Sequence, residues 1–138
     1  MKRLAIALCI VGMFVAGLSG CGKGGPKPEP TVHVTGKVLY QGKPLPVDAN
    51  PKQLDATRLS LTFLRINEDK PGISKSTHVK QDGSFEIDIP VGKYRIAVTY
   101  GPVVNGPDPV GDKFTEEDSP IVKEINGECN IEIELSQY

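Results

Sequence analysis

The sequence has little of what usually carries chemistry: its 138 residues include no tryptophan, three cysteines and two histidines. The lack of tryptophan argues against the aromatic platforms on which many glycan-binding proteins stack sugars. Lysine and arginine (16) do not outnumber aspartate and glutamate (17), which argues against a nucleic-acid partner because such a partner requires a basic face. No long stretch has helical periodicity. These absences leave an export signal and a β-rich pattern as the informative features.

The first 20 residues are typical of a secretory signal peptide. Lys2 and Arg3 form its basic start, and residues 4–18 are almost entirely apolar. The apolar run is shorter than the roughly 20 residues of a membrane-spanning helix, and small residues follow it directly. We therefore expect the signal peptide (1–20) to be removed rather than kept as a transmembrane anchor.

The end of this segment indicates lipidation. Leu18, Ser19, Gly20 and Cys21 resemble the lipobox at which bacterial lipoproteins are lipidated and cut. In such proteins the cysteine thiol receives a diacylglycerol, and the new amine is usually acylated with a fatty acid such as palmitate. Each buried CH₂ contributes about 0.8 kcal/mol, so two or three acyl chains form a stable anchor. The resemblance implies a mature protein that begins at Cys21 and is held on a membrane.

The residue after the lipobox bears on which membrane is used. Gly22 stands where many lipoproteins that stay at the inner membrane have aspartate, so the outer membrane is favoured by analogy. The domain is then expected to face either the periplasm or the cell surface. Loss of the two basic residues of the signal leaves 14 of the 16 basic side chains against 17 acidic ones, a formal charge of about −3.

Cysteine use is consistent with a domain without disulfides. Cys9 leaves with the signal peptide and Cys21 becomes a thioether, so Cys129 is the one remaining thiol. A single thiol forms no intramolecular disulfide, and the mature domain must be stable through its core alone.

A short spacer follows the lipidated cysteine. Residues 22–30 read GKGGPKPEP, in which glycines give flexibility and alternating prolines favour an extended polyproline II conformation. At ~3.1 Å per residue this spacer could hold the domain about 25–30 Å above the bilayer. We interpret residues 21–30 as a lipidated cysteine with a flexible tether.

Residues 31–138 provide one domain with one core. Apolar and polar side chains alternate with period two, and turn-forming residues interrupt the alternation. Strands are expected at residues 32–40, 58–63, 74–79, 85–89, 94–100, 121–125 and 129–135. The inward side chains are expected to include Val34, Val38, Leu59, Leu61, Phe63, Phe85, Ile87, Ile89, Tyr94, Ile96, Val98, Cys129, Ile131, Ile133 and Leu135.

Turn sequences complete the fold prediction. Asp82-Gly83 and Asn126-Gly127 can supply the positive φ angles that two-residue hairpin turns require. The second turn is expected to close a hairpin between the last two strands. Seven short antiparallel strands at this spacing predict an all-β sandwich.

Two long segments interrupt the strand pattern, at residues 46–57 and 101–119. The second is rich in glycine, proline and acidic residues, with Phe114 as its expected anchor and Thr115 as the cap of a single helical turn. Long loops in a compact domain are often functional. The two segments are therefore the candidate interaction surface.

The acidic residues of the second segment are candidate calcium ligands. Asp108, Asp112, Glu116 and Asp118 supply the hard oxygen ligands that suit Ca²⁺, although they lack the spacing of an EF-hand. The competing interpretation is an acidic loop that faces water.

Three blocks resemble carboxypeptidase regulatory-like domains. Residues 34–45 (VTGKVLYQGKPL) are similar to the opening of such domains, and residues 82–87 (DGSFEI) with 90–96 (PVGKYRI) are similar to their central hairpin. The final blocks 113–121 and 131–135 are similar to the end of small bacterial lipoproteins built on this domain. The resemblance implies a transthyretin-like (prealbumin-like, Ig-like) sandwich and, usually, a non-catalytic accessory or adhesion module.

Enzyme functions find little support. Hydroxyisourate hydrolases of the transthyretin-like group end in Tyr-Arg-Gly-Ser, whereas this chain ends in LSQY (135–138). His33 and His78 are expected on solvated strand faces, and Cys129 is expected to be a small core residue rather than a nucleophile.

The sequence therefore favours a non-enzymatic envelope lipoprotein without a cofactor. Its sandwich would serve protein–protein interaction or structural support, with another envelope protein as a possible partner. The alternative is a ligand-binding module that uses residues 101–119 to bind Ca²⁺ or a cell-wall glycan.

Overall fold

The computed structural model describes residues 27–50, 52, 54–66, 72–102 and 108–138. Its elements are β1 (Thr31–Leu39), β2 (Arg58–Arg65), β3 (Ser74–His78), β4 (Ser84–Pro90), β5 (Gly92–Gly101), the 3₁₀ helix η1 (Gly111–Phe114), β6 (Val122–Ile125), β7 (Cys129–Glu134) and the 3₁₀ helix η2 (Leu135–Gln137). The signal peptide, the lipobox and most of the tether lie outside the described residues. Among the described residues, no helix has the length and apolar character needed to cross a membrane.

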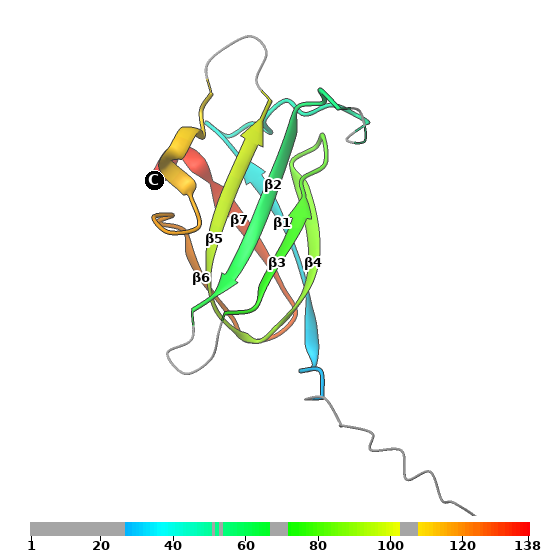
Figure 1. Ribbon diagram of the computed structural model, residues 1–138, viewed down its shortest axis with the longest axis vertical. Coiled ribbons are helices and arrows are strands. Elements are labelled where there is room, and N and C mark those ends of the chain that lie inside the picture. Colours follow the sequence, from blue (N-terminus) through cyan, green and yellow to red (C-terminus); the bar gives the residue numbers. More distant parts are fainter. Residues whose placement is uncertain (1–26, 51, 53, 67–71, 103–107) are drawn as a thin grey trace, which may run out of the picture.

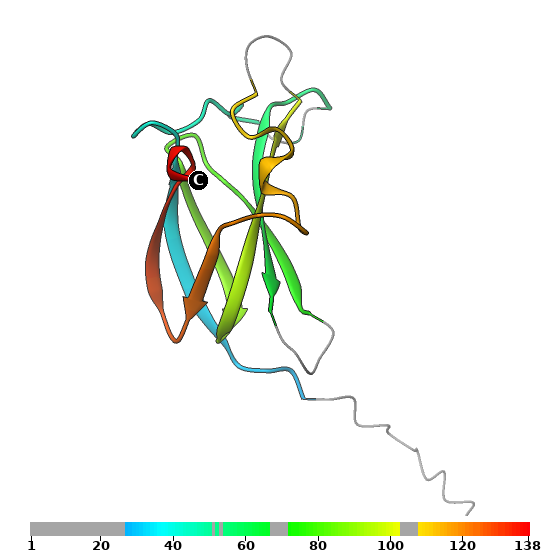
Figure 2. The same ribbon diagram turned by 90° about the vertical axis from the view of Figure 1, so that its left-hand side faces the viewer.

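The strands form two sheets that face each other (Figure 2). One sheet has the order β4-β1-β7 and the other the order β3-β2-β5-β6. The predicted seven-stranded β-sandwich is confirmed. The expected strands match the observed ones to within a few residues at their ends.

The core fills the space between the sheets, as the alternation predicts. Its buried members come from every strand except the polar β3, and the largest fully buried side chains are Tyr94, Phe63, Phe114, Leu59, Leu61, Ile89, Ile96, Ile121, Ile125, Ile133, Leu135 and Val34. Cys129 and Ile131 are only partly buried against this core. All strands and buried core residues that the structure describes lie within residues 31–138.

Gly36 marks the closest approach inside the three-stranded sheet. A Cβ atom at this position would lie 2.1 Å from the carbonyl oxygen of Ile131 and 2.7 Å from the ring of Phe85. Because real Cβ contacts are never this short, only glycine allows β1 to lie flat between β4 and β7 while Phe85 packs across it.

Three topological expectations are wrong. β7 pairs with β1 in parallel, with Val34 opposite Cys129, so the sandwich is not wholly antiparallel. β4 and β5 do not form the expected central hairpin, because they lie in different sheets. The last two strands are not a hairpin, because β6 pairs with β5 in the other sheet. Neither Asn126 nor Gly127 has a positive φ angle. Residues 126–128 instead cross the roughly 10 Å between the sheets, which lets β6 and β7 bury their apolar faces from opposite sides of one core.

The other predicted turn also joins the two sheets. Gly83 has a φ angle of 81°, as expected, and its N–H donates to the carbonyl of Lys80 at 2.9 Å. The turn connects β3 to β4, whose neighbouring edges are linked by side chains. The Thr77 hydroxyl donates to the carbonyl of Glu86 at 2.9 Å, and the Lys75 ammonium donates to that of Asp88 at 2.8 Å. These bonds close the sandwich along one side.

The sandwich has two distinct ends (Figure 1). We call one the tether end: residues 27–32, 64–66, 72–74 and 89–93, where the chain enters β1. We call the other the loop end: the described parts of residues 40–58, 78–84 and 100–121, together with residues 134–138. Figure 1 shows the chain entering β1 at the bottom, whereas the described part of residues 46–57, the helix η1 and the C-terminus lie in the upper half.

Candidate functional site at the loop end

The loop end brings together the two long segments that the sequence singled out. The Tyr100 hydroxyl, at the end of β5, donates to the carbonyl of Pro46 at 2.8 Å. The Thr57 hydroxyl donates to the carbonyl of Pro102 at 2.9 Å. Segments 46–57 and 101–119 therefore lie side by side at their bases.

Segment 46–57 is closed at its base. The N–H of Asp48 donates to the carbonyl of Thr57 at 3.0 Å, and the N–H of Thr57 donates to the Asp48 carboxylate at 2.6 Å. Ala56 is buried beneath the segment, whereas Leu54 is 97% exposed. The segment thus presents a large aliphatic side chain to the surroundings from a fixed base.

Segment 101–119 is anchored as predicted. Phe114 is 1% exposed and packs edge-on against the ring of Tyr138, with 6.5 Å between the ring centroids. Thr115 caps a single turn, because its hydroxyl accepts from the N–H of Asp118 at 3.2 Å and its carbonyl accepts from Ser119 at 3.0 Å. The buried Ser119 hydroxyl donates to the carbonyl of Ile96 at 2.5 Å. The described part of this segment is therefore fastened to β5.

The candidate calcium ligands do not form a cluster. Asp108, Asp112, Glu116 and Asp118 are all exposed, and the Asp108 carboxylate accepts the N–H of Val110 at 2.9 Å. Among the described residues, no three His, Cys, Asp or Glu side chains are grouped in a way that could hold a metal ion. Calcium binding by this segment stays a prediction.

A carboxylate that the sequence analysis did not single out stabilises the rim of the loop end. Gln41 and Gly42, with φ angles of 53° and 74°, form a tight turn between Tyr40 and Lys43. Their N–H groups each donate to the Glu134 carboxylate at 2.9 Å. The hydroxyl and the N–H of Ser136 also donate to this carboxylate, at 2.5 and 3.1 Å, and these hydrogen bonds lower the pKa of Glu134 to about 2.

The loop end also contains a pocket of about 510 Å³. It lies between segment 46–57, the start of β2, and the end of β3 with the turn that follows. Its lining residues are Val47, Asp48, Ala49, Thr57, Arg58, Leu59, His78, Val79, Lys80, Gln81 and Asp82. The sequence analysis did not predict this pocket, because its lining comes from three separate segments with no shared motif.

The two histidines lie apart, on different sheets. His33, on β1, is exposed and contacts the Asp88 carboxylate at 2.8 Å, which raises the pKa of His33. The Nδ1 atom of His78, on β3, lies 2.8 Å from the Ser60 hydroxyl. Both are solvent-exposed, as predicted. His33 has no further role that the described contacts indicate, whereas His78 lines the pocket.

Comparisons with known proteins identify the fold but no activity. No protein-family model matches this chain, and no curated protein matches it. The solved structures that resemble it include two crystal structures of DUF3823 family proteins. The one from Parabacteroides merdae has a TM-score of 0.51 at 22% identity, over 78% of this chain and 46% of that chain. The one from Bacteroides ovatus has a TM-score of 0.44 at 19% identity, over 75% of this chain and 43% of that chain.

This chain therefore spans less than half of either neighbour. At such low identity, the likeness to the P. merdae protein concerns the β-rich fold alone. The chain is thus a β-sandwich similar in fold to part of a DUF3823 family protein.

Proposed function

We propose that the protein is a non-enzymatic lipoprotein of the bacterial cell envelope that presents the loop end of its sandwich to another envelope protein. Lipid on Cys21 would anchor it, in the outer membrane by analogy with the residue that follows. The resemblance to carboxypeptidase regulatory-like domains agrees with an accessory role, since members of that group are usually non-catalytic. The observation that carries the proposal is the placement of the long segments at the end opposite the tether (Figure 1).

At the tether end, side-chain contacts hold the start of the described chain to the sandwich. One terminal nitrogen of Arg65 contacts the Glu29 carboxylate, and the other donates to the carbonyl of Val91 at 2.8 Å. The Arg65 side chain is only 14% exposed. Because Arg65 links Glu29 to the sandwich, the chain would be held at the tether end from Glu29 onward, and the loop end would point away from the membrane.

The described residues offer little support for catalysis. Among the described residues, Ser60 and His78 form the one serine–histidine hydrogen bond. It involves the Nδ1 atom of His78 rather than the Nε2 atom that serine hydrolases use. No described contact places a carboxylate on His78 to orient its ring. The Cys129 thiol is half-buried and packs against the core. An interaction module therefore accounts for these residues better than an enzyme does.

Site-specific photocrosslinking in cells tests the proposal. A photoreactive residue would replace Leu54, which is 97% exposed at the loop end. The matched control is Glu132, which is exposed on the outer face of β7 away from both ends. We expect one recurrent protein adduct from position 54 and none from position 132. The same adduct from both positions, or none from position 54, would reject the loop end as the interaction surface.

The anchor is tested separately. Mass spectrometry of the purified protein should show an acylated N-terminal cysteine, and Cys21→Ser should move the protein from the membrane fraction to the soluble fraction. An unmodified Cys21 would remove the lipoprotein part of the proposal, and it would leave the crosslinking result to stand alone.

A further inference from the structure

The pocket at the loop end has an aliphatic floor. Leu59 and Val79 are buried and form part of its lining, and Val47 and Ala49 line it from segment 46–57. No aromatic side chain is among its lining residues. The pocket therefore suits a flexible aliphatic group, and it lacks a ring on which a nucleobase or a sugar could stack.

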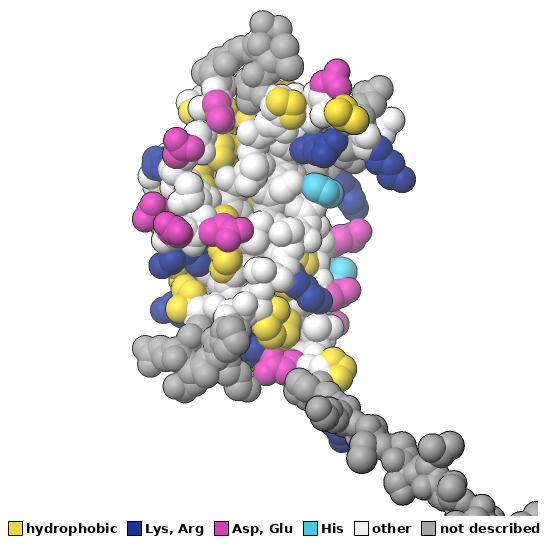
Figure 3. Space-filling view, viewed as in Figure 1, with side chains coloured by type: hydrophobic (Ala, Val, Ile, Leu, Met, Phe, Trp, Pro, Cys, Tyr) yellow, Lys and Arg dark blue, Asp and Glu magenta, His cyan; other side chains and the backbone are white. Residues whose placement is uncertain are grey.

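The rim of the pocket carries two cationic side chains and a histidine. Arg58, Lys80 and His78 all line it. Figure 3 shows basic side chains and a histidine gathered near the loop end on the β3 side, whereas acidic side chains gather along the side of η1 and β6. The Nδ1 atom of His78 is engaged by Ser60, which leaves the Nε2 atom for another partner.

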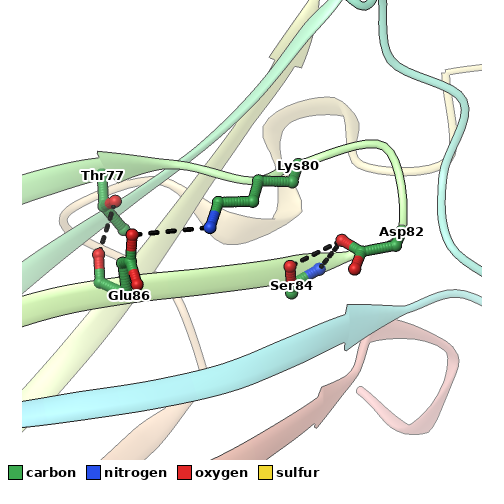
Figure 4. Close-up of polar contacts among 5 residues, drawn as sticks. All are labelled: Thr77, Lys80, Asp82, Ser84 and Glu86. Carbon is green, nitrogen blue, oxygen red and sulfur yellow. Dashed lines mark hydrogen bonds and ion pairs between the residues drawn. The ribbon is translucent and has the colours of Figure 1, made fainter.

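Among the residues that the structure describes, Lys80 has one weak partner. Its ammonium lies 3.4 Å from the Glu86 carboxylate, and both side chains are more than half exposed (Figure 4). An exposed pair of this length contributes little, so the ammonium can turn toward a bound anion at small cost.

The two acidic side chains of the pocket are engaged by the protein's own backbone. The Asp48 carboxylate accepts the N–H of Thr57 at 2.6 Å. The Asp82 carboxylate accepts the hydroxyl of Ser84 at 2.6 Å and its N–H at 3.0 Å (Figure 4), and these bonds lower the pKa of Asp82. Both carboxylates hold the turns that form the pocket, so their oxygens already accept hydrogen bonds from N–H and hydroxyl groups of the protein.

We propose that this pocket binds a small amphiphilic anion, a carboxylate or phosphate that carries a short aliphatic chain. Arg58, His78 and Lys80 would bind the anionic group, and Leu59, Val79 and Val47 would contact the chain. The volume of about 510 Å³ lies within the range of roughly 300–1,000 Å³ that small-molecule sites occupy. This site does not depend on the proposed function, since a small ligand could bind whether or not a protein partner does.

Nuclear magnetic resonance titration of the mature chain carrying Cys21→Ser tests the site. This lipid-free chain contains the complete sandwich described above. The probes are hexanoate and hexyl phosphate, with 1-hexanol and hexylamine as the matched uncharged and cationic ligands and inorganic phosphate as the anion without a chain. We expect both amphiphilic anions to shift the amide signals of His78, Val79 and Lys80, and to bind about tenfold more tightly than 1-hexanol.

Variants separate the pocket from the rest of the surface. Lys80→Gln is expected to weaken hexanoate binding by up to about fivefold, the scale of one exposed charge pair. Ala49→Phe, at an exposed position of the lining, should fill the pocket and abolish the shifts. The matched control is Lys37→Gln, an exposed lysine on β1 outside the lining, which should bind like the wild type.

Three results would overturn the proposal. Equal affinity for 1-hexanol and hexanoate would remove the role of the cations, and equal affinity for inorganic phosphate would remove the role of the aliphatic floor. The absence of shifts in the pocket at about 10 mM hexanoate would remove the site itself, since even weak specific complexes have dissociation constants near 1 mM.

Discussion

The two ends of the sandwich are built by different means. At the tether end, the single residue Val91 joins β4 to β5, and Arg65 connects Glu29 to the carbonyl of Val91. At the loop end, the chain makes two long excursions that are fastened at a few points, such as Phe114 in one and the carboxylate of Asp48 in the other. One end thus holds the chain in place, whereas the other has room for a binding surface.

The largest expected effect comes from the anchor of segment 101–119. Phe114→Ala removes a fully buried ring from the core, and it should lower the free energy of unfolding by about 3–5 kcal/mol. Urea denaturation of the lipid-free chain measures this loss. A loss below about 1 kcal/mol would contradict the role of Phe114 as an anchor, because segment 101–119 would then unfold independently of the sandwich.

The connection at the tether end is tested by Arg65→Ala. The variant removes the guanidinium that contacts Glu29 and the carbonyl of Val91. It should lower the free energy of unfolding by about 1–2 kcal/mol, because both bonds involve a charged donor. Amide hydrogen exchange at Thr31 and Val32, the first residues of β1, should accelerate. The control Lys93→Ala, an exposed residue of β5, should leave exchange at these amides unchanged. Equal exchange in both variants would show that Arg65 does not hold the tether.

The pH dependence of stability tests the rim of the loop end. The pKa of Glu134 is lowered from 4.5 to about 2, so its ionised form stabilises the fold fully above pH 4.5. This contribution is lost as the pH falls from 4.5 towards 2. Glu134→Gln should therefore flatten the fall of the urea midpoint in that window, whereas Glu132→Gln, on the same strand and exposed, should keep the wild-type slope. An unchanged slope in Glu134→Gln would contradict the assignment.

The smallest effect is expected at the turn that Glu134 holds. Gln41 has a φ angle of 53°, which costs a glutamine more than an asparagine, and Gly42 follows it with a φ of 74°. Gln41→Asn should raise the free energy of unfolding by about 0.5 kcal/mol, measurable as a higher urea midpoint. A lower midpoint would show that the glutamine side chain contributes more than its backbone strain costs.

Alternation predicted the sandwich because one face of each strand must be buried. Phe85 and Ile96, for example, lie inward as their phase requires. The predicted pairing of β6 with β7 was wrong because the Asn126-Gly127 sequence indicates only that the chain can turn there. Which strands pair depends on the sheet that each strand joins. The role of Glu134 was missed for a related reason, since its partners Gln41 and Gly42 lie 93 and 92 residues away.

The pocket could not be predicted because none of its lining residues forms a recognisable motif with its neighbours in sequence. From the sequence, His78 is interpreted as a solvated residue of a polar strand, and Lys80 is interpreted as part of a turn. Only the fold places them beside Arg58 and the aliphatic side chains of Leu59 and Val79. By contrast, lipidation at Cys21 is a prediction from local sequence alone, because lipidating enzymes recognise the extended chain rather than a folded site.

We propose that the loop end points away from the membrane. The sandwich is roughly 30 Å long, from the 10 residues of β5 at ~3.3 Å each, so its two ends should differ clearly in distance from a bilayer. Fluorescent labels on Leu54→Cys and Val91→Cys, each in a Cys129→Ser background, would report energy transfer to acceptor lipids in vesicles that hold the lipidated protein. We predict much stronger transfer from position 91 than from position 54. Equal transfer, or stronger transfer from position 54, would contradict the account.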